Sequence, residues 1–275
     1  SLPLRLILFL LFLAAALTWN DLWINDRANP AVMYYHDGVA ALVSVYKKDG
    51  QQCLSTDNLD VQGADPASPA KNPKRLGYLP RLLHPKADLG LVLQIGLGTG
   101  INLSALADGA SETEVVEIIP ELPEAARFFR ADNDDVLSDP KVRLIIDDGR
   151  HHIKASTRRY DLIVGDLFFP ENAGTGNLYS REHFAHCRAA LSDSGMMTQW
   201  VPLQQVSMDV LKSIMKTFAT EFPHVSLWWG TISGGRPIVG LVGTVAEQQI
   251  DPRELARRVK LWAPALSKIG WTSPS

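Results

Sequence analysis

A glycine-rich turn is the first segment of the chain whose residue types suggest chemistry. The sequence GLGTG, at residues 96–100, follows an apolar run that predicts a β-strand and precedes a segment that predicts a helix. Glycine permits a tight turn and a close approach of the backbone to a ligand, and the N-terminus of the next helix offers unpaired N–H groups. The candidate binding residues of this turn are Gly96, Gly98, Thr99 and Gly100.

Acidic residues follow the next two predicted strands. Glu117 closes the second strand about 20 positions after the turn, the spacing at which an acid receives the two hydroxyl groups of a ribose. The sequence DDG, after the third strand, can offer a carboxylate or a backbone edge to the amino group of an adenine. The candidate residues of these two segments are Glu117, Ile118, Asp147, Asp148 and Gly149. Because parallel strands end at the same edge of a sheet, these segments and the turn together predict a nucleotide site.

Asp166 ends the fourth predicted strand and is the candidate catalytic residue. It precedes the sequence LFFP and a glycine-rich stretch at residues 171–178, which we expect to cross the mouth of the site. A carboxylate in this position can accept a proton from an attacking amine or attract a cationic ligand.

Each of these residues also has a purely structural interpretation. Gly98 can form a plain turn, Glu117 can be a solvated acid at a strand end, and both Asp148 and Asp166 can cap a helix. Their joint placement at the ends of four successive strands favours a binding site.

The elements that must position these residues alternate between apolar runs and helical segments, as in a doubly wound sheet. Strands are expected at residues 91–95, 114–118, 142–146, 161–166, 196–201, 225–229 and 238–243. Helices are expected at residues 75–83, 102–108, 122–133, 151–156, 179–191, 209–222 and 251–262. The fold class is therefore predicted as α/β, a Rossmann-like, seven-stranded sheet of the methyltransferase type.

The chain before this sheet divides into an apolar segment and a β-rich module. Residues 34–55 alternate, with a turn at residues 48–50, whereas residues 57–73 predict a loop over the site. Residues 6–17 are unbroken apolar sequence, which favours a membrane-associated or truncated transmembrane helix; a signal-peptide core and a helix packed on protein are the alternatives. The predicted units are residues 1–28, 29–74, 75–250 and 251–275.

Composition excludes several function classes. The formal net charge is -3 with both signs well mixed, which argues against a nucleic-acid partner. The two cysteines, Cys53 and Cys187, lie too far apart in sequence for a disulfide framework or a zinc site, so no metal is expected. We expect a cytoplasmic domain that is anchored at the inner membrane by its apolar segment. Its partner is expected to be a small-molecule acceptor, and the sequence leaves open whether the protein forms a homo-oligomer.

Several motifs resemble the spermidine synthase family: VLQIGLGTG, VVEI, IIDDGR, YDLIVGDLFFP and NLYSREHF, between about residues 35 and 203. The resemblance is closest to the spermidine-synthase-like domains fused to membrane segments in bacteria. It implies S-adenosylmethionine or its decarboxylated form as co-substrate, bound by the glycine turn. It further implies that Glu117 holds the ribose, that Asp148 and Gly149 border the adenine, and that Asp166 is the catalytic aspartate.

Three departures from the family pattern concern the two substrates. Phe169 replaces the second acid of the family's DxxDP motif, and Thr99 replaces an acid that meets the aminopropyl ammonium group. Lys71, Lys74 and Arg75 add positive charge before the first strand of the sheet. The candidate substrate-binding residues are Asp60, Phe169 and Tyr179. Phe169 and the added positive charge predict an acceptor that is smaller or less cationic than a polyamine. Thr99 instead makes the glycine turn compatible with a nucleotide that carries a carboxylate, as intact S-adenosylmethionine does.

Three hypotheses about function follow. The first is transfer of an aminopropyl group to an amine, with release of methylthioadenosine. The second is a methyltransferase, or another enzyme that consumes S-adenosylmethionine, on the same fold. The third is a nucleotide-sensing domain without turnover, which the fold alone leaves open.

Overall fold

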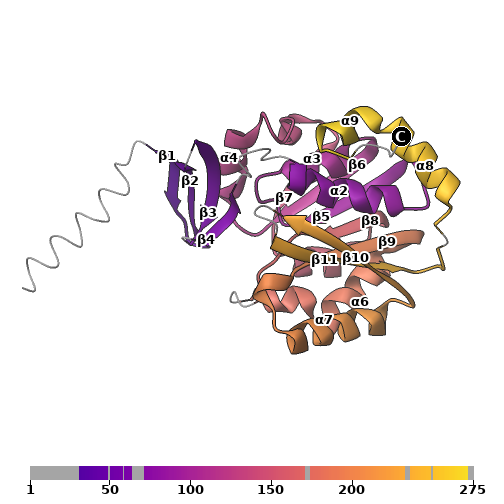
Figure 1. The fold of residues 1–275 in the computed structure, drawn as a ribbon. Helices are drawn as coiled ribbons and strands as arrows, with labels where there is room; N and C mark the ends of the chain where they lie inside the picture. The colour runs from indigo at the N-terminus through magenta and orange to yellow at the C-terminus, as the bar shows by residue number, and fades with distance from the viewer. Residues whose placement is uncertain are drawn as a thin grey trace, which may run out of the picture.

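The chain folds into two β-sheets, a small one near the N-terminus and a large one that carries helices on both faces (Figure 1). The computed structural model describes residues 31–48, 50–57, 59–63, 71–170, 174–232, 236–248 and 250–271. The apolar segment at residues 6–17 lies outside the described residues. Within the described ranges, no helix has both the length and the apolar character needed to cross a membrane.

The small sheet is antiparallel, in the order β1-β2-β3-β4. Its strands are β1 (Val32–Asp37), β2 (Leu42–Lys48), β3 (Gln51–Thr56) and β4 (Leu59–Gly63). This confirms a β-rich module, but the loop expected over residues 57–73 was wrong in part. Asp57, with a φ of 51°, turns the chain so that β4 pairs with β3, and helix α2 already begins at Lys71. Strand β4 forms through backbone hydrogen bonds to β3, and the prediction missed it because its sequence was not recognised as an alternating apolar pattern.

The large sheet has seven strands in the order β10-β11-β9-β8-β5-β6-β7. They are β5 (Leu89–Ile95), β6 (Ala110–Glu117), β7 (Val142–Ile146), β8 (Tyr160–Gly165), β9 (Leu191–Pro202), β10 (His224–Ile232) and β11 (Arg236–Thr244). Strands β7, β6, β5, β8 and β9 run parallel, and β11 is antiparallel to both β9 and β10. The seven predicted strands and the Rossmann-like class are confirmed.

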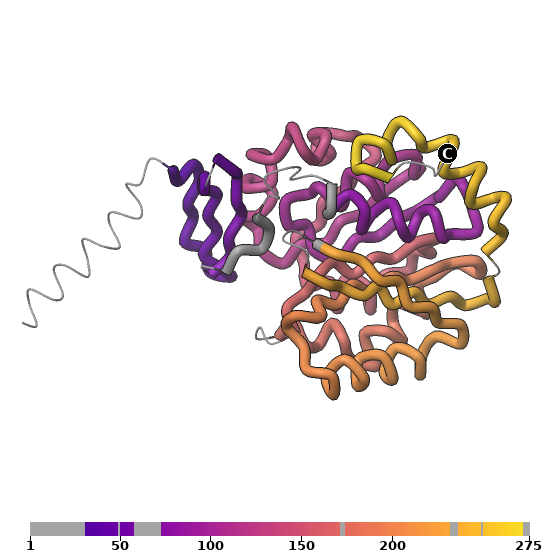
Figure 2. The backbone as a smooth tube through the Cα atoms, viewed as in Figure 1, coloured from indigo at the N-terminus to yellow at the C-terminus, as the bar shows by residue number. Residues whose placement is uncertain are grey.

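Helices cover both faces of this sheet. The described helices are α2 (Lys71–Leu83), α3 (Ile101–Ala107), α4 (Leu122–Ala126), α5 (Gly149–Ala155), α6 (Arg181–Ala190), α7 (Met208–Glu221), α8 (Pro252–Leu261) and α9 (Ala263–Lys268). In Figures 1 and 2, α2, α8 and α9 lie on one side of the sheet and α6 and α7 on the other. The parallel strands are thus buried between helical layers, which explains their continuous apolar runs.

The helix expected over residues 122–133 is shorter than predicted. Helix α4 ends at Ala126 and is followed by a single 3-10 turn, Arg127–Phe129. The Asn133 side chain then donates hydrogen bonds to the carbonyl oxygens of Ala126 and Thr99, at 3.0 and 2.8 Å. A side chain that binds a helical carbonyl competes with the next helical turn, which accounts for the early end.

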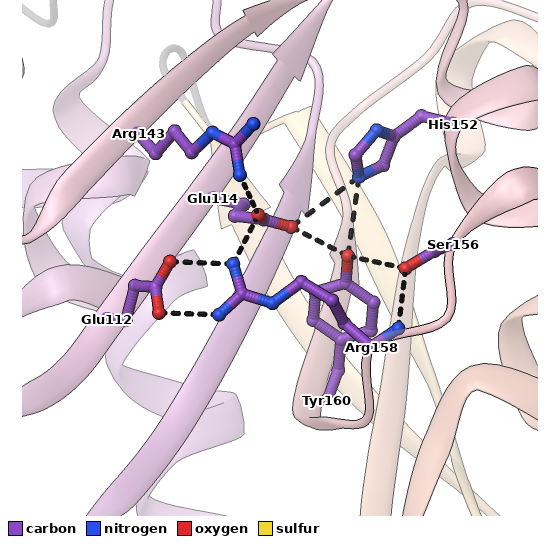
Figure 3. A network of polar contacts seen from close by, with 7 residues as sticks. All are labelled: Glu112, Glu114, Arg143, His152, Ser156, Arg158 and Tyr160. Atoms are coloured by element: carbon purple, nitrogen blue, oxygen red, sulfur yellow. Dashed lines mark hydrogen bonds and ion pairs between the residues drawn. The ribbon is translucent and has the colours of Figure 1, made fainter.

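A polar network fixes α5 to the sheet (Figure 3). At its centre, the Glu114 carboxylate on β6 is buried and lies 2.6 Å from the guanidinium of Arg158 and 3.4 Å from that of Arg143. Tyr160, on β8, donates a hydrogen bond of 2.6 Å to the same carboxylate. His152, on α5, lies 3.5 Å from it. One buried acid therefore connects three strands to the helix that begins with the DDG sequence.

Candidate active site

A cavity of about 340 Å³ opens at the carboxyl ends of β5, β6, β7 and β8. It is lined by Thr56, Ile95, Gly96, Gly98, Val116, Glu117, Ile118, Ile119, Leu122, Asp148, Gly149, Arg150, Asp166, Leu167, Phe168, Phe169, Gly174, Thr175 and Leu178. Open α/β sheets bind ligands outside the carboxyl ends of their strands. The cavity therefore brings together eight of the predicted site residues, namely Gly96, Gly98, Glu117, Ile118, Asp148, Gly149, Asp166 and Phe169.

The glycine turn needs glycine for conformation and for space. Gly96, Gly98 and Gly100 have φ values of 88°, 53° and 76°, in the left-handed region that other residues rarely adopt. A Cβ atom on Gly96 would also lie 3.0 Å from the ring of Phe168. The turn can therefore pass directly beneath the wall of the cavity that follows β8.

Glu117 connects the glycine turn to the end of β6. Its Oε2 accepts a hydrogen bond of 2.8 Å from the backbone N–H of Leu97, and its Oε1 accepts one of 2.9 Å from that of Ile119. Burial raises the pKa of this carboxyl group, while the backbone donors oppose that rise. Because two carboxylate oxygens together offer about four acceptor positions, lone pairs remain for hydroxyl groups in the cavity.

The edge of the cavity at β7 combines an apolar platform with a helix start. Ile118 is 58% exposed and lines the cavity, a place where a flat apolar ring can pack. Asp148 is the N-cap of α5, and its side chain accepts a hydrogen bond of 2.8 Å from the backbone N–H of Arg150. The same carboxylate forms an ion pair of 2.9 Å with the guanidinium group of Arg150. Burial acts to raise the pKa of Asp148, but the Arg150 hydrogen bonds outweigh it and lower the pKa. The helix-cap interpretation is thus correct, and Asp148 lines the cavity as well.

Gly149 and Asp147 differ in their relation to the cavity. A Cβ atom on Gly149 would lie 2.5 Å from the side chain of Ile95, so only glycine lets α5 start this close to β5. The exposed Asp147 accepts a hydrogen bond of 2.7 Å from the backbone N–H of Asp148 and is not among the lining residues. Asp147 therefore supports the turn into α5.

Asp166 lies at the centre of the cavity wall, where the chain leaves β8. Its Oδ1 accepts hydrogen bonds from the backbone N–H of Leu167, at 2.8 Å, and from the side-chain amide of Asn102, at 3.4 Å. Burial raises the pKa of Asp166 to about 6, and these two donors oppose the rise. A carboxylate with this pKa is largely ionised at neutral pH and is a stronger base than an ordinary aspartate, so it can accept a proton from an amine.

Tyr179 holds the segment after β8 in place. Its hydroxyl donates a hydrogen bond of 2.8 Å to the carbonyl oxygen of Phe168 and lies 3.3 Å from that of Trp200. Tyr179 is buried and is not among the lining residues, in contrast to Phe169. Tyr179 thus supports the cavity wall, and its contact with a substrate stays a prediction.

Two other predicted residues, Thr99 and Gly100, are not among the described residues that line the cavity. Thr99 is 1% exposed, and its carbonyl oxygen accepts a hydrogen bond from Asn133; Gly100 packs against the same side chain. The turn between two left-handed glycines buries Thr99 instead of presenting it to a ligand. The backbone of Asp60 pairs with Ser55, and its side chain lies outside the described part of the chain.

The sequence prediction missed several lining residues. Arg150 follows the predicted DDG sequence directly, so its place at the start of α5 was a usable signal. Thr56, at the end of β3, lines the cavity only because the small sheet docks beside it, which no local pattern reveals. Among the described residues, no group of three or more His, Cys, Asp and Glu side chains is placed to hold a metal ion.

Comparison with known sequences gives consistent matches. The model of the spermine/spermidine synthase domain matches residues 77–234. A polyamine aminopropyltransferase of Thermoplasma volcanium is 33% identical over 169 residues, 61% of this chain and 62% of the relative. Polyamine aminopropyltransferase 2 of Hyperthermus butylicus is 30% identical over 172 residues, 61% of this chain and 55% of the relative. The chain thus spans less than two thirds of the length of these relatives.

Solved structures show the same fold. A spermidine synthase in complex with the transition state analogue AdoDATO has a TM-score of 0.71 at 16% identity, covering 87% of this chain and 88% of that one. The spermidine synthase from Thermotoga maritima has a TM-score of 0.69 at 16% identity, with the same coverage. At this identity, the structures establish the fold. Since the family model matches more than half of its residues, the chain belongs to the spermine/spermidine synthase domain family.

Proposed function

We propose that the protein transfers an aminopropyl group from decarboxylated S-adenosylmethionine to an amine and releases methylthioadenosine. The observation that carries the proposal is the position of Asp166, a carboxylate with a raised pKa in the same cavity as the glycine turn and Glu117. The relatives named polyamine aminopropyltransferase, and the spermidine synthase bound to AdoDATO, favour the decarboxylated nucleotide as donor.

The lining suggests how the nucleotide lies in the cavity. The ribose hydroxyl groups would meet the free lone pairs of Glu117, and the adenine would pack on Ile118 beside the Asp148–Gly149 edge. This direction leaves the sulfonium group near Asp166, where a negative charge favours a cation.

The reaction is an in-line displacement at the methylene carbon of the aminopropyl group that is bonded to sulfur. The acceptor nitrogen gives its lone pair to this carbon, the carbon–sulfur bond breaks, and the bonding electrons go to sulfur, which leaves as a neutral thioether. An amine acceptor has a pKa near 10 and is almost wholly protonated at neutral pH. Asp166 would bind the ammonium and take the proton that must leave the nitrogen, a step that contributes about 100- to 10,000-fold to the rate.

Identification of the adenosyl product tests this proposal. The full chain is incubated with decarboxylated or intact S-adenosylmethionine and a panel of amines, and the products are separated by mass spectrometry. We expect methylthioadenosine from the decarboxylated donor. S-adenosylhomocysteine would instead indicate methyl transfer, and the absence of both products would favour a nucleotide-sensing domain.

The apolar run at residues 6–17 supports a separate proposal about location. We infer that this segment associates with a membrane and holds the cavity at the cytoplasmic face, because its sequence is unbroken apolar and membrane binding grows with buried apolar area. Flotation of the full chain with phospholipid vesicles, compared with a chain lacking residues 1–28, tests this. Equal behaviour of the two chains would contradict it.

A further inference from the structure

Among the described residues, the cavity wall beyond Asp166 is mainly apolar, with Thr175 as its polar side chain. Leu167, Phe168 and Phe169 follow Asp166 directly and all line the cavity, as does Leu178 from the 3-10 turn Thr175–Tyr179. Two large rings and two leucines therefore stand next to the carboxylate that would receive the acceptor nitrogen.

This wall is fixed in position. The Phe168 ring abuts the glycine turn, lies edge-on to the ring of Tyr179 with centroids 6.5 Å apart, and has its carbonyl held by the Tyr179 hydroxyl. These contacts restrict the movement of the Phe168 ring, so at least this apolar side chain stays beside the glycine turn.

The described lining residues include three carboxylates, and each accepts hydrogen bonds from the protein. Glu117 accepts from two backbone N–H groups at the end of β6, and Asp148 pairs with Arg150 at 2.9 Å. Asp148 is therefore neutralised by a cation, whereas Glu117 and Asp166 keep uncharged partners. Of these two, Asp166 follows β8, so the described lining offers one carboxylate for an ammonium group at this part of the wall.

A diamine would carry a second ammonium group into this wall. That group would lose water against leucine and phenylalanine side chains, and burying a charge without a hydrogen-bonded partner is unfavourable. A phenylalanine ring attracts cations, but more weakly than a carboxylate that accepts charge-assisted hydrogen bonds. An alkyl group in the same position would instead gain free energy from burial.

We propose that the acceptor is a primary monoamine with an apolar chain rather than a diamine. The inference rests on the aminopropyl transfer proposed above and names the acceptor class of the same site. The amine nitrogen meets Asp166, and its alkyl chain packs on Phe168, Phe169 and Leu178.

Two amines of equal length test this inference. Pentylamine carries a methyl group where putrescine carries its second amino group, and the two are otherwise the same chain. With decarboxylated S-adenosylmethionine, we expect kcat/KM for methylthioadenosine release to be at least tenfold higher with pentylamine. Equal values, or a higher value with putrescine, would overturn the inference and leave aminopropyl transfer standing. No methylthioadenosine with either amine would contradict both proposals.

Substitution of Phe169 supplies a second comparison. Phe169→Asp places a carboxylate in the wall and should shift the ratio of the two kcat/KM values at least tenfold toward putrescine. The matched variant Phe169→Leu keeps the wall apolar and should retain the preference for pentylamine. Nucleotide affinity and the circular dichroism spectrum establish that both variants are folded, and an unchanged ratio in folded Phe169→Asp would contradict the role of the wall. If that variant does not fold, the wild-type comparison decides alone.

Discussion

The side-chain amide of Asn102, on the helix that follows the glycine turn, donates a hydrogen bond of 3.4 Å to the carboxylate of Asp166 at the end of β8. The contact joins two segments that are distant in sequence and adjacent in the fold. A donor to the ionised carboxylate stabilises that form and lowers the pKa of Asp166, against the larger effect of burial. Asn102 therefore acts on the candidate base through its protonation equilibrium.

Replacement of Asn102 by leucine should change the pH dependence of the reaction. Because the donor is lost, the pKa of Asp166 rises, and the acidic limb of the pH–rate profile moves to higher pH by up to about one unit, since a hydrogen bond to a charged group is worth roughly 1.5 kcal/mol. Profiles of kcat for wild type and Asn102→Leu with the same amine measure the shift. Asn102→Ser, which keeps a donor, should lie between them, and coincident profiles would argue against this role.

Glu117 should control nucleotide affinity. In Glu117→Gln one carboxylate oxygen becomes an NH2 group that faces the backbone N–H of Leu97 or of Ile119, so one of these two groups loses its acceptor and the negative charge at the ribose site is lost. The loss costs about 1 to 3 kcal/mol, and calorimetry should record at least a tenfold weaker binding of decarboxylated S-adenosylmethionine. Glu124→Gln, on the exposed side of α4, is the matched control and should bind normally. Equal affinities of the two variants would remove Glu117 from the nucleotide site.

Glu114 should matter for stability far more than its neighbour on the same strand, Glu112. Glu114→Gln removes the buried negative charge that Arg158, Arg143 and Tyr160 share, and disrupting a buried hydrogen-bond partner typically costs about 1 to 3 kcal/mol (Figure 3). The Glu112 side chain is 41% exposed, against 1% for Glu114, so Glu112→Gln should cost less than about 1 kcal/mol. Urea denaturation of both variants measures the difference, and equal midpoints would show that burial does not govern this network.

The sequence predicted the large sheet well because its strands carry strong local signals. Continuous apolar runs, bounded by glycine and charged residues, mark buried parallel strands such as β8, and the seven expected strands are all present. Strand β4 escaped prediction because Leu59–Gly63 contains few apolar residues and depends on pairing with β3. The early end of α4 depends on Asn133, which binds the last residue of the helix, Ala126, and also Thr99 in the distant glycine turn.

The site was predictable where the chemistry follows the order of strands. Glu117 is the last residue of β6, and Asp148 and Asp166 lie within two residues of the ends of β7 and β8, so strand order alone places them at one edge. Asn102 and Thr56 reach Asp166 and the cavity through tertiary packing, for which the sequence spacing carries no signal.

The most direct test of the account is turnover by Asp166→Asn. The amide keeps the size and shape of the side chain but cannot take a proton from an ammonium group, so the variant should bind decarboxylated S-adenosylmethionine nearly as well as wild type. Its rate of methylthioadenosine release should fall at least about 100-fold, the smallest contribution expected of a general base. A folded variant that binds the nucleotide and retains most of its turnover would contradict the assignment of Asp166 as the proton acceptor.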